Sequence, residues 1–283
     1  MEQLTALVTE TKIPVGKTAK AIFDWLNAHA AFLFDAASKG IEGFIESILA
    51  ALQFPPPLVF TALMVALTWA LQRSWRTCLL TGLGFLFILN QGYWEETMQS
   101  LALVLAACLV CMAAGVPLGI AAAHRPRLHA WLQPVLDLMQ TLPTFVYLIP
   151  AIVFFGIGTV PGLIATVVFV LPAPIRLTQI GIRSTPPALV EAATAFGATP
   201  RQLLWKVELP WARPQIMAGL NQTIMLSLSM VVIAALVGAS GLGVPVVRAL
   251  NSVNTALGFE SGIIIVVVAI MLDRMLRVRG RHD

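Results

Sequence analysis

The sequence contains few charged residues. Asp, Glu, Lys and Arg make up 11% of its 283 residues, whereas a soluble domain typically carries about 25%. Its hydrophobic fraction is 58% and its mean hydropathy is +0.84. This composition excludes an ordinary water-soluble globular domain. It favours an integral membrane protein, because a helix that crosses ~30 Å of hydrocarbon needs about 20 apolar residues.

Residue patterns typical of catalytic, metal-binding or nucleotide-binding sites are also absent or incomplete. The three cysteines, Cys78, Cys108 and Cys111, all fall in apolar stretches, and no further Cys or His completes a metal site with them. The stretch 15–18, Val-Gly-Lys-Thr, lacks the first glycine of a phosphate-binding loop, since position 11 is Thr11. No Ser/His/Asp set or pair of catalytic acids is present. The sequence therefore predicts a protein that is not an enzyme and has no ATP site, metal or cofactor of its own.

Seven apolar stretches are predicted to cross the membrane, so the expected fold is all-α. The acidic residues Asp137, Glu260 and Asp273 lie at the ends of these stretches. An ion-driven secondary carrier usually needs carboxylates within the membrane, so their position argues against that class. The predicted spans are residues 55–71, 77–93, 98–123, 142–158, 160–176, 216–239 and 258–273.

The positions of Lys and Arg predict the orientation. If the polar loop 177–215 faces the cytoplasm, thirteen of the eighteen basic residues lie inside and five outside. The positive-inside rule selects this orientation. It places the N-terminus outside, and the C-terminus, with a basic tail at 276–283, in the cytoplasm. The net positive charge is then explained by topology, and no nucleic-acid partner is expected.

Residues 1–54 form a separate segment. Their apolar side chains recur with helical spacing from Ile41 to Leu52, while charged residues occupy the other side. This pattern predicts an amphipathic helix at the outer membrane interface, which ends before Pro55. An external brace and a surface for a partner both fit it. The spans 55–71 and 77–93 are then accessory helices, and residues 94–275 form the core.

The loop 177–215 is predicted to hold two short helices. The first has Thr185 as its N-cap and Pro186 in its first position. It ends at Gly197, which can adopt the left-handed conformation that terminates helices. Two interpretations remain open for this exposed loop: a hairpin that packs on itself, and a rigid surface that docks into a partner.

The second helix of this loop is predicted to begin at Thr199 and to end at Pro210. Gln202 follows Thr199 by three residues, as in a capping box. Helix ends fixed in this way indicate a loop of defined shape.

The span 216–239 is the most polar of the seven and holds candidates for a translocation path. Three of the candidates are spaced by four residues, so they can share one helix face. Such side chains either line a water-filled route or hydrogen-bond neighbouring helices. The candidate path residues are Asn221, Met225 and Ser229, together with Thr141 and Tyr147.

The loop also resembles a known motif. Glu-Ala-Ala at 191–193, Gly197 four residues later, and Val207 followed by Leu-Pro at 209–210 are similar to the EAA loop of binding-protein-dependent ABC import permeases. The resemblance implies that this segment is the coupling helix, which inserts into a groove on an ATPase subunit. The residues that it assigns to this contact are Glu191, Ala192, Ala193, Phe196, Gly197, Leu209 and Pro210.

Three further stretches resemble the glycine betaine/proline betaine permeases: residues 140–162, residues 226–233 and the Gly-rich residues 238–243. This resemblance implies a type I (MetI-like) permease fold in a bacterial inner membrane and a role in osmoprotection. The implied partners are a second permease copy, two cytoplasmic ATPases that bind ATP and Mg, and an external binding protein. Choline, carnitine or another small substrate is the alternative solute, and a secondary carrier is the alternative class.

Overall fold

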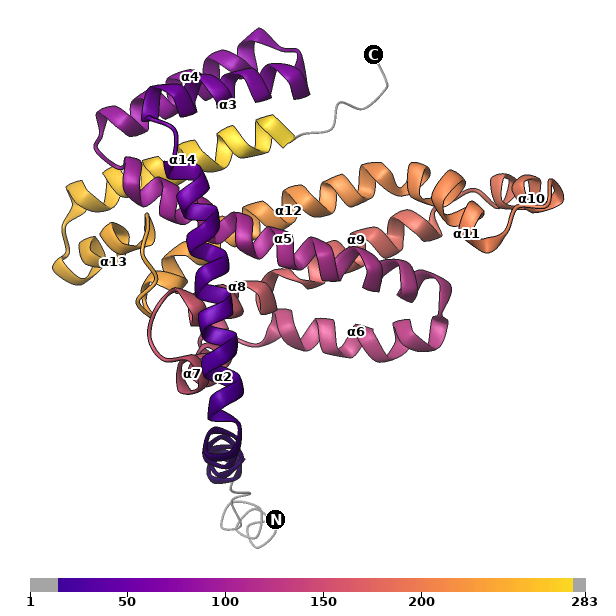
Figure 1. Cartoon of the computed structure of the whole chain (residues 1–283), viewed down its shortest axis with the longest axis horizontal. Coiled ribbons are helices and arrows are strands. Elements are labelled where there is room, and N and C mark those ends of the chain that lie inside the picture. Colours follow the sequence, from indigo (N-terminus) through magenta and orange to yellow (C-terminus); the bar gives the residue numbers. More distant parts are fainter. Residues whose placement is uncertain (1–14, 277–283) are drawn as a thin grey trace, which may run out of the picture.

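The computed structural model describes residues 15–276, and in this range the chain is helical with short connections (Figure 1). This confirms the all-α prediction. The helices are α2 (Val15–Gln53), α3 (Pro57–Gln72), α4 (Trp75–Asn90), α5 (Trp94–His124), α6 (Pro126–Thr141), α7 (Thr144–Phe155), α8 (Thr159–Val170), α9 (Pro172–Arg183), α10 (Pro187–Ala195), α11 (Pro200–Leu203), the π-helical turn η1 (Leu204–Glu208), α12 (Leu209–Ala235), α13 (Gly243–Ser252) and α14 (Thr255–Leu276).

Four helical segments are long and apolar enough to cross a membrane: Trp94–His124, Thr159–Arg183, Pro200–Ala235 and Thr255–Leu276. Two bent pairs, α2 with α3 and α6 with α7, raise the number to six if each pair forms one span. These helices do not confirm the predicted number of seven separate spans. The α4 helix is apolar but has only 16 residues.

The predicted span 142–158 is not one straight membrane-crossing helix in the structure. Its helix α7 has 12 residues, which is about 18 Å of helix and too short to cross the hydrocarbon. It follows α6 at a bend of 93°. The bend has a local cause, because the residue before a proline is pushed out of the helical region. Leu142, which precedes Pro143, is extended and ends α6.

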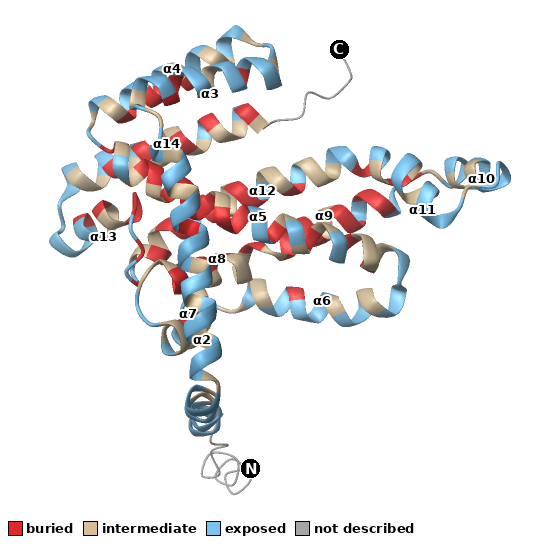
Figure 2. Ribbon diagram, in the orientation of Figure 1, coloured by how far each residue is buried: buried red, intermediate tan, exposed pale blue. Residues whose placement is uncertain are grey.

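The long helices pack side by side, and α5, α9 and α12 form the centre of the bundle (Figures 1 and 2). Close approach depends on glycine. A Cβ at Gly119 of α5 would lie 2.6 Å from the carbonyl oxygen of Ile175 in α9, and a Cβ at Gly181 of α9 would lie 3.0 Å from the Cβ of Ala212 in α12. Small residues at such crossings let helix backbones touch.

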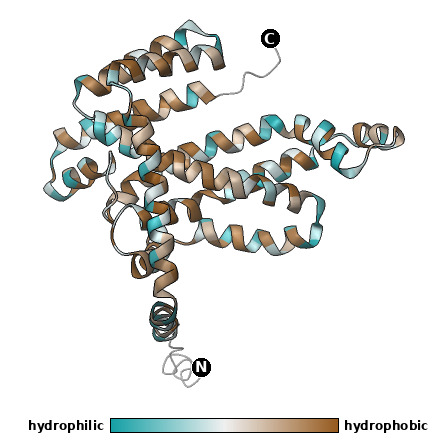
Figure 3. Cartoon of the chain, in the orientation of Figure 1, coloured by the Kyte–Doolittle hydropathy of each residue, from teal (hydrophilic) through white to brown (hydrophobic). Residues whose placement is uncertain are grey.

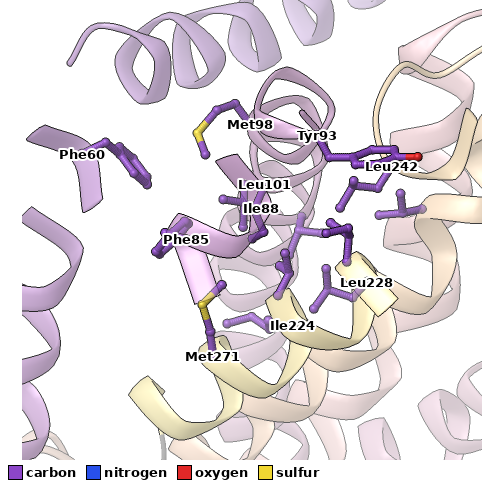
Figure 4. Packing of buried hydrophobic residues seen from close by; sticks show 14 of the residues in the cluster. Phe60, Phe85, Ile88, Tyr93, Met98, Leu101, Ile224, Leu228, Leu242 and Met271 are labelled. Carbon is purple, nitrogen blue, oxygen red and sulfur yellow. The ribbon is translucent and has the colours of Figure 1, made fainter. Parts of the chain in front are cut away.

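A second group of helices packs on this centre through one large apolar cluster. Phe60 of α3, Phe85 of α4, Met98 of α5, Ile224 of α12 and Met271 of α14 are all buried in it (Figure 4). The cluster joins the accessory helices α3 and α4 to the core through α14. Residues 55–93 are thus packed against the same body as the core.

Helix α2 crosses the bundle instead of running along it (Figure 1), and it meets α3 at a bend of 94°. Its predicted apolar stripe contacts protein: Ile45 is buried in a cluster with Ala102 and Ala106 of α5. Ile41 and Ile48 pack against the same cluster. The stripe is confirmed as one helix face, and in this structure α5 covers it. The placement of α2 at the outer interface stays a prediction.

The outer faces of the long helices remain apolar. Figure 3 shows hydrophobic residues along their length, including on faces that Figure 2 shows as exposed. Leu63, Leu109 and Val266 are examples of large exposed apolar side chains. Surfaces of this kind are unusual on soluble monomers and suit a lipid environment.

Candidate functional site

Helices α10 and α11 project from one end of the bundle, beyond the ends of α5 and α9 (Figure 1). The coupling segment is defined here as α10, α11 and η1, residues 187–208. None of the nine residues of α10 is buried, and Phe196, which follows α10, is 94% exposed. A large aromatic side chain that makes so little contact with its own chain is available to a partner.

The start of α10 differs from the prediction. The N-cap is Pro186 and the helix begins at Pro187, while the buried hydroxyl of Thr185 has no hydrogen-bond partner among the described residues. Since Pro187 forces the preceding residue out of the helical region, the second proline sets the boundary.

The end of α10 is as predicted. Gly197 has a φ of +80°, a conformation that favours glycine. The amide of Ala198 donates to the carbonyl of Ala193 at 3.0 Å, and that of Gly197 donates to Thr194 at 2.9 Å. This pair of hydrogen bonds is the Schellman arrangement, which satisfies the last carbonyls of a helix.

The predicted capping box of α11 is confirmed. The amide of Gln202 donates to the Thr199 hydroxyl at 3.3 Å, and the amide of Thr199 donates to the Gln202 side chain at 2.9 Å. The predicted stop at Pro210 is wrong, because the chain continues from η1 directly into α12. Pro210 lies in the first turn of α12, directly after the π-helical turn η1. The segment thus has both of its turns fixed locally and continues into a long helix.

The structure brings together five of the seven predicted coupling residues, at α10 and its end. The other two, Leu209 and Pro210, lie at the base of the segment, where α12 begins. Of the seven, Ala193 and Leu209 are half-buried; the exposed ones are Glu191, Ala192, Phe196, Gly197 and Pro210. Sequence reasoning missed Trp205, which is exposed on η1.

The predicted path residues of α12 do not share one environment. The Asn221 amide donates to the Asp273 carboxylate of α14 at 2.9 Å, and Met225 packs against the large apolar cluster. Ser229 is exposed and donates to the carbonyl of Met225 at 3.1 Å. Sequence reasoning missed Gln222, which is exposed and lies seven residues before Ser229. That spacing places the two on one helix face.

The other two path candidates lie near the bend between α6 and α7. Thr141 is the exposed last residue of α6. Tyr147 packs where α7, α8 and α12 meet, beside Leu148, Ala165 and Met230. Its buried hydroxyl has no hydrogen-bond partner among the described residues, and an unpaired buried hydroxyl is uncommon in native proteins.

The opposite end of the bundle carries a polar cavity of about 410 Å³. Its lining includes Tyr93, Glu96, Arg248 and Glu260. Burial, and then the neighbouring Glu260 carboxylate, raise the pKa of Tyr93. The two ends therefore differ: one presents a projecting segment and the other a charged hollow.

Comparisons with known proteins agree with this architecture. A family model described as binding-protein-dependent transport system inner membrane component matches residues 115–278. The glycine betaine transport system permease protein OpuAB of Bacillus subtilis (strain 168) is 46% identical over 264 residues, which cover 93% of each chain. The glycine betaine/carnitine transport permease protein GbuB of Listeria monocytogenes serotype 1/2a (strain 10403S) is 44% identical over 93% of this chain and 94% of that protein.

A solved structure of the MetNI methionine ABC transporter, in an inward facing conformation, matches with a TM-score of 0.58. The match covers 69% of this chain and 98% of that chain at 23% identity. At this identity the likeness shows the fold, which is that of a MetI-like permease. The family match covers more than half of the chain and the relatives align over nearly all of it. The chain therefore belongs to the binding-protein-dependent transport system inner membrane component family, the membrane-spanning permease subunits of ABC importers.

Proposed function

We propose that the chain is the permease subunit of an ATP-driven importer for glycine betaine, proline betaine or a related quaternary-ammonium solute, with a role in osmoprotection. The observation that carries this proposal is the coupling segment. It bears the Glu-Ala-Ala-x-x-x-Gly pattern, is fixed at both of its turns, and leaves Phe196 exposed. A rigid exposed segment of this kind suits docking into a groove on a partner.

The partner at this segment is a cytoplasmic ATPase subunit, which binds the ATP and Mg that this chain does not. The small side chains Ala192 and Ala193 allow close approach, Phe196 supplies an apolar anchor, and Glu191 supplies a charged contact. When the ATPases close on ATP, the coupling segments move together. The spans then shift from inward-facing to outward-facing, because ATP binding stabilises one of two conformations.

The proposed assembly contains two copies of this chain. Helices α6 and α7 support this arrangement, since Trp131 and Val135 of α6 and Phe145 and Ile149 of α7 are exposed in one copy. A second copy that covers this face places the path between the two permeases. Each copy binds one ATPase, and an external binding protein docks at the opposite end, where the polar cavity opens.

The proposed orientation places the coupling segment and the C-terminus in the cytoplasm and the N-terminus outside. The segment and its surroundings carry Arg183, Arg201, Lys206 and Arg213. A concentration of basic residues on one side of the bundle fits the positive-inside rule.

The proposed path runs along the exposed face of α12 that holds Gln222 and Ser229. These groups are polar and uncharged, so they let a bulky zwitterion pass without a strong electrostatic trap. Asn221 fits the alternative role better, because its amide is already bound to Asp273. Thr141 and Tyr147, near the bend of α6 and α7, remain the other path candidates.

The proposed solute follows from the relatives, one named for glycine betaine and one for glycine betaine and carnitine. Carnitine is therefore the second candidate. Discrimination among such solutes falls to the binding protein, in which aromatic side chains recognise a quaternary ammonium group by cation–π attraction.

The solute can be tested by uptake in osmotically stressed cells that lack their other compatible-solute importers and express this permease with its neighbouring ATPase and binding protein. Labelled glycine betaine should accumulate, and unlabelled proline betaine should compete better than carnitine or choline. Accumulation of labelled carnitine without accumulation of labelled glycine betaine would reassign the solute. An absence of uptake for every quaternary-ammonium compound tested would reject the class.

A further inference from the structure

The π-helical turn η1 contains a buried acid that the coupling motif does not explain. A π-turn is wider than an α-turn and often occurs at functional sites. Here it ends at Glu208, which is only 7% exposed, whereas its neighbours Trp205 and Lys206 are exposed. An acidic side chain is almost never buried without a partner.

The partner of Glu208 is the last residue of α5. His124 Nε2 lies 2.9 Å from Glu208 Oε2 and 3.1 Å from Oε1, and its Nδ1 lies 3.0 Å from the carbonyl oxygen of Ile120. Both ring nitrogens of His124 thus lie within hydrogen-bond distance of acceptor oxygens. A charge-assisted hydrogen bond to a buried carboxylate is stronger than a neutral one.

The hydrogen bonds from α9 at this end of α5 are longer. Arg183 of α9 donates to the carbonyls of Ala122 and Ala123 at 3.5 Å. At this end of α5, the hydrogen bonds to Glu208 are therefore shorter than those from Arg183, although α5 also packs closely on α9 at Gly119.

The far end of α5 is attached to the loop between α12 and α13. The Ser100 hydroxyl accepts from the amide of Leu242 at 2.8 Å, and a Cβ on Gly241, which has a φ of +123°, would lie 2.4 Å from that hydroxyl. The 31 residues of α5 form a helix about 46 Å long. One continuous helix, with Pro117 between the two contacts, thus touches the coupling segment at one end and the loop 238–243 at the other.

We propose that the His124–Glu208 pair fastens α5 to the coupling segment, so that α5 carries the movement of that segment to the loop 238–243 at the opposite end of the permease. The inference rests on the proposed function and adds two positioning residues to it. Neither residue acts on the solute; both keep two helices moving as one body.

The first test measures solute moved per ATP hydrolysed, in proteoliposomes that hold the permease with its ATPase and binding protein. His124→Leu and Glu208→Leu should each lower this ratio by at least about fivefold, the lower end of ordinary coupling effects, while ATP hydrolysis continues. Glu208→Gln, which keeps the size and an acceptor oxygen, should fall in between. The matched control is Asp137→Asn, which removes the Arg176–Asp137 ion pair between α6 and α9 and should leave the ratio unchanged.

The second test replaces the pair by a covalent bridge. His124→Cys and Glu208→Cys are combined in a chain without its three native cysteines, and a short, reducible bifunctional methanethiosulfonate joins them. The bridged permease should regain the wild-type ratio and lose it again on reduction. A bridge that stops transport would overturn the proposal, because the two helices would then have to separate during the cycle. Unbridged variants with a wild-type ratio would overturn it as well.

The interaction between His124 and Glu208 can also be tested without a transport assay. In the purified permease, the thermal unfolding temperature of the double Leu variant should be no lower than that of Glu208→Leu alone, because the two losses are one interaction. Strictly additive shifts would contradict the pairing. In the transport assay, wild-type protein without ATP-dependent uptake would count against the proposed function, whereas active wild-type protein with unaffected variants would count against the α5 connection alone.

Discussion

Gly197 is the residue at which the local backbone and the proposed coupling role coincide. Its φ of +80° is strained for a side chain with a branched Cβ, yet a Cβ there would meet no atom within 4 Å. Gly197→Val should therefore cost about 1–3 kcal/mol in the local turn without a steric clash, and should weaken ATPase binding and uptake while insertion stays normal. Gly197→Asn should be milder, because asparagine tolerates this conformation.

The measurement is uptake and ATPase co-purification, normalised to the amount of permease in the membrane. If Gly197→Val transports at the wild-type rate, the shape of this turn is unimportant for coupling.

At Gly119, substitution is limited by the space around the residue and not by its backbone conformation. A Cβ there would lie 2.6 Å from the Ile175 carbonyl oxygen and 2.7 Å from the Cβ of Thr178. Neither atom is the flexible end of a side chain, so Gly119→Ala should destabilise the permease by about 1–3 kcal/mol. Gly43→Ala on α2 is the control, since a Cβ there meets nothing within 4 Å. Thermal unfolding in detergent checks both, and equal unfolding temperatures would mean that α5 and α9 separate at little cost.

Local rules predicted the end of α10 and the start of α11, where the cause lies within a few positions, but they misplaced the N-cap at Thr185 and the stop at Pro210. The positive φ of Gly197 and the capping box of Thr199 follow from neighbours in the chain. Two side-chain pairs could not be predicted in this way. Asp273 is 52 residues from its partner Asn221, and Glu208 is 84 residues from its partner His124. Nothing in the residues between them indicates such pairs, because packing of whole helices creates them.

Among the helices, α12 offers the clearest test of whether its polar side chains line a translocation path or only pack against neighbouring helices. Single cysteines at 222 and 229, in a chain without Cys78, Cys108 and Cys111, should react with aqueous thiol reagents, and the rates should change when ATP is trapped. Cysteines at 221 and 224 should react slowly in every state, since Asn221 is bonded to α14 and Ile224 is buried. Equal labelling at all four positions, insensitive to ATP, would leave the packing interpretation of this helix standing.

Helix lengths and bends show where periodicity is insufficient. The apolar stretch at 142–158 predicted a span, but Pro143 creates a bend, and the stretch becomes a short helix after α6. The stripe from Ile41 to Leu52 was correctly assigned to one helix face. Periodicity gives that face but not the surface that covers it, and here it packs on α5.

For the whole molecule, the orientation gives a direct labelling prediction. In a cysteine-free chain, Lys39→Cys on α2 should react with a membrane-impermeant thiol reagent added to intact spheroplasts. Arg201→Cys on α11 should react only after the membrane is opened. Both side chains are exposed, so access depends on the side of the membrane. The reverse pattern would invert the proposed topology.

The central claim is that this permease moves a quaternary-ammonium solute with energy received at its coupling segment. The most direct measurement is uptake of labelled glycine betaine into proteoliposomes that contain the permease, with and without its ATPase, in the presence of the binding protein. The account predicts uptake that requires both the ATPase and ATP, and that falls when Phe196 is replaced by Asp. Uptake by the permease alone, driven by a proton or sodium gradient, would contradict it.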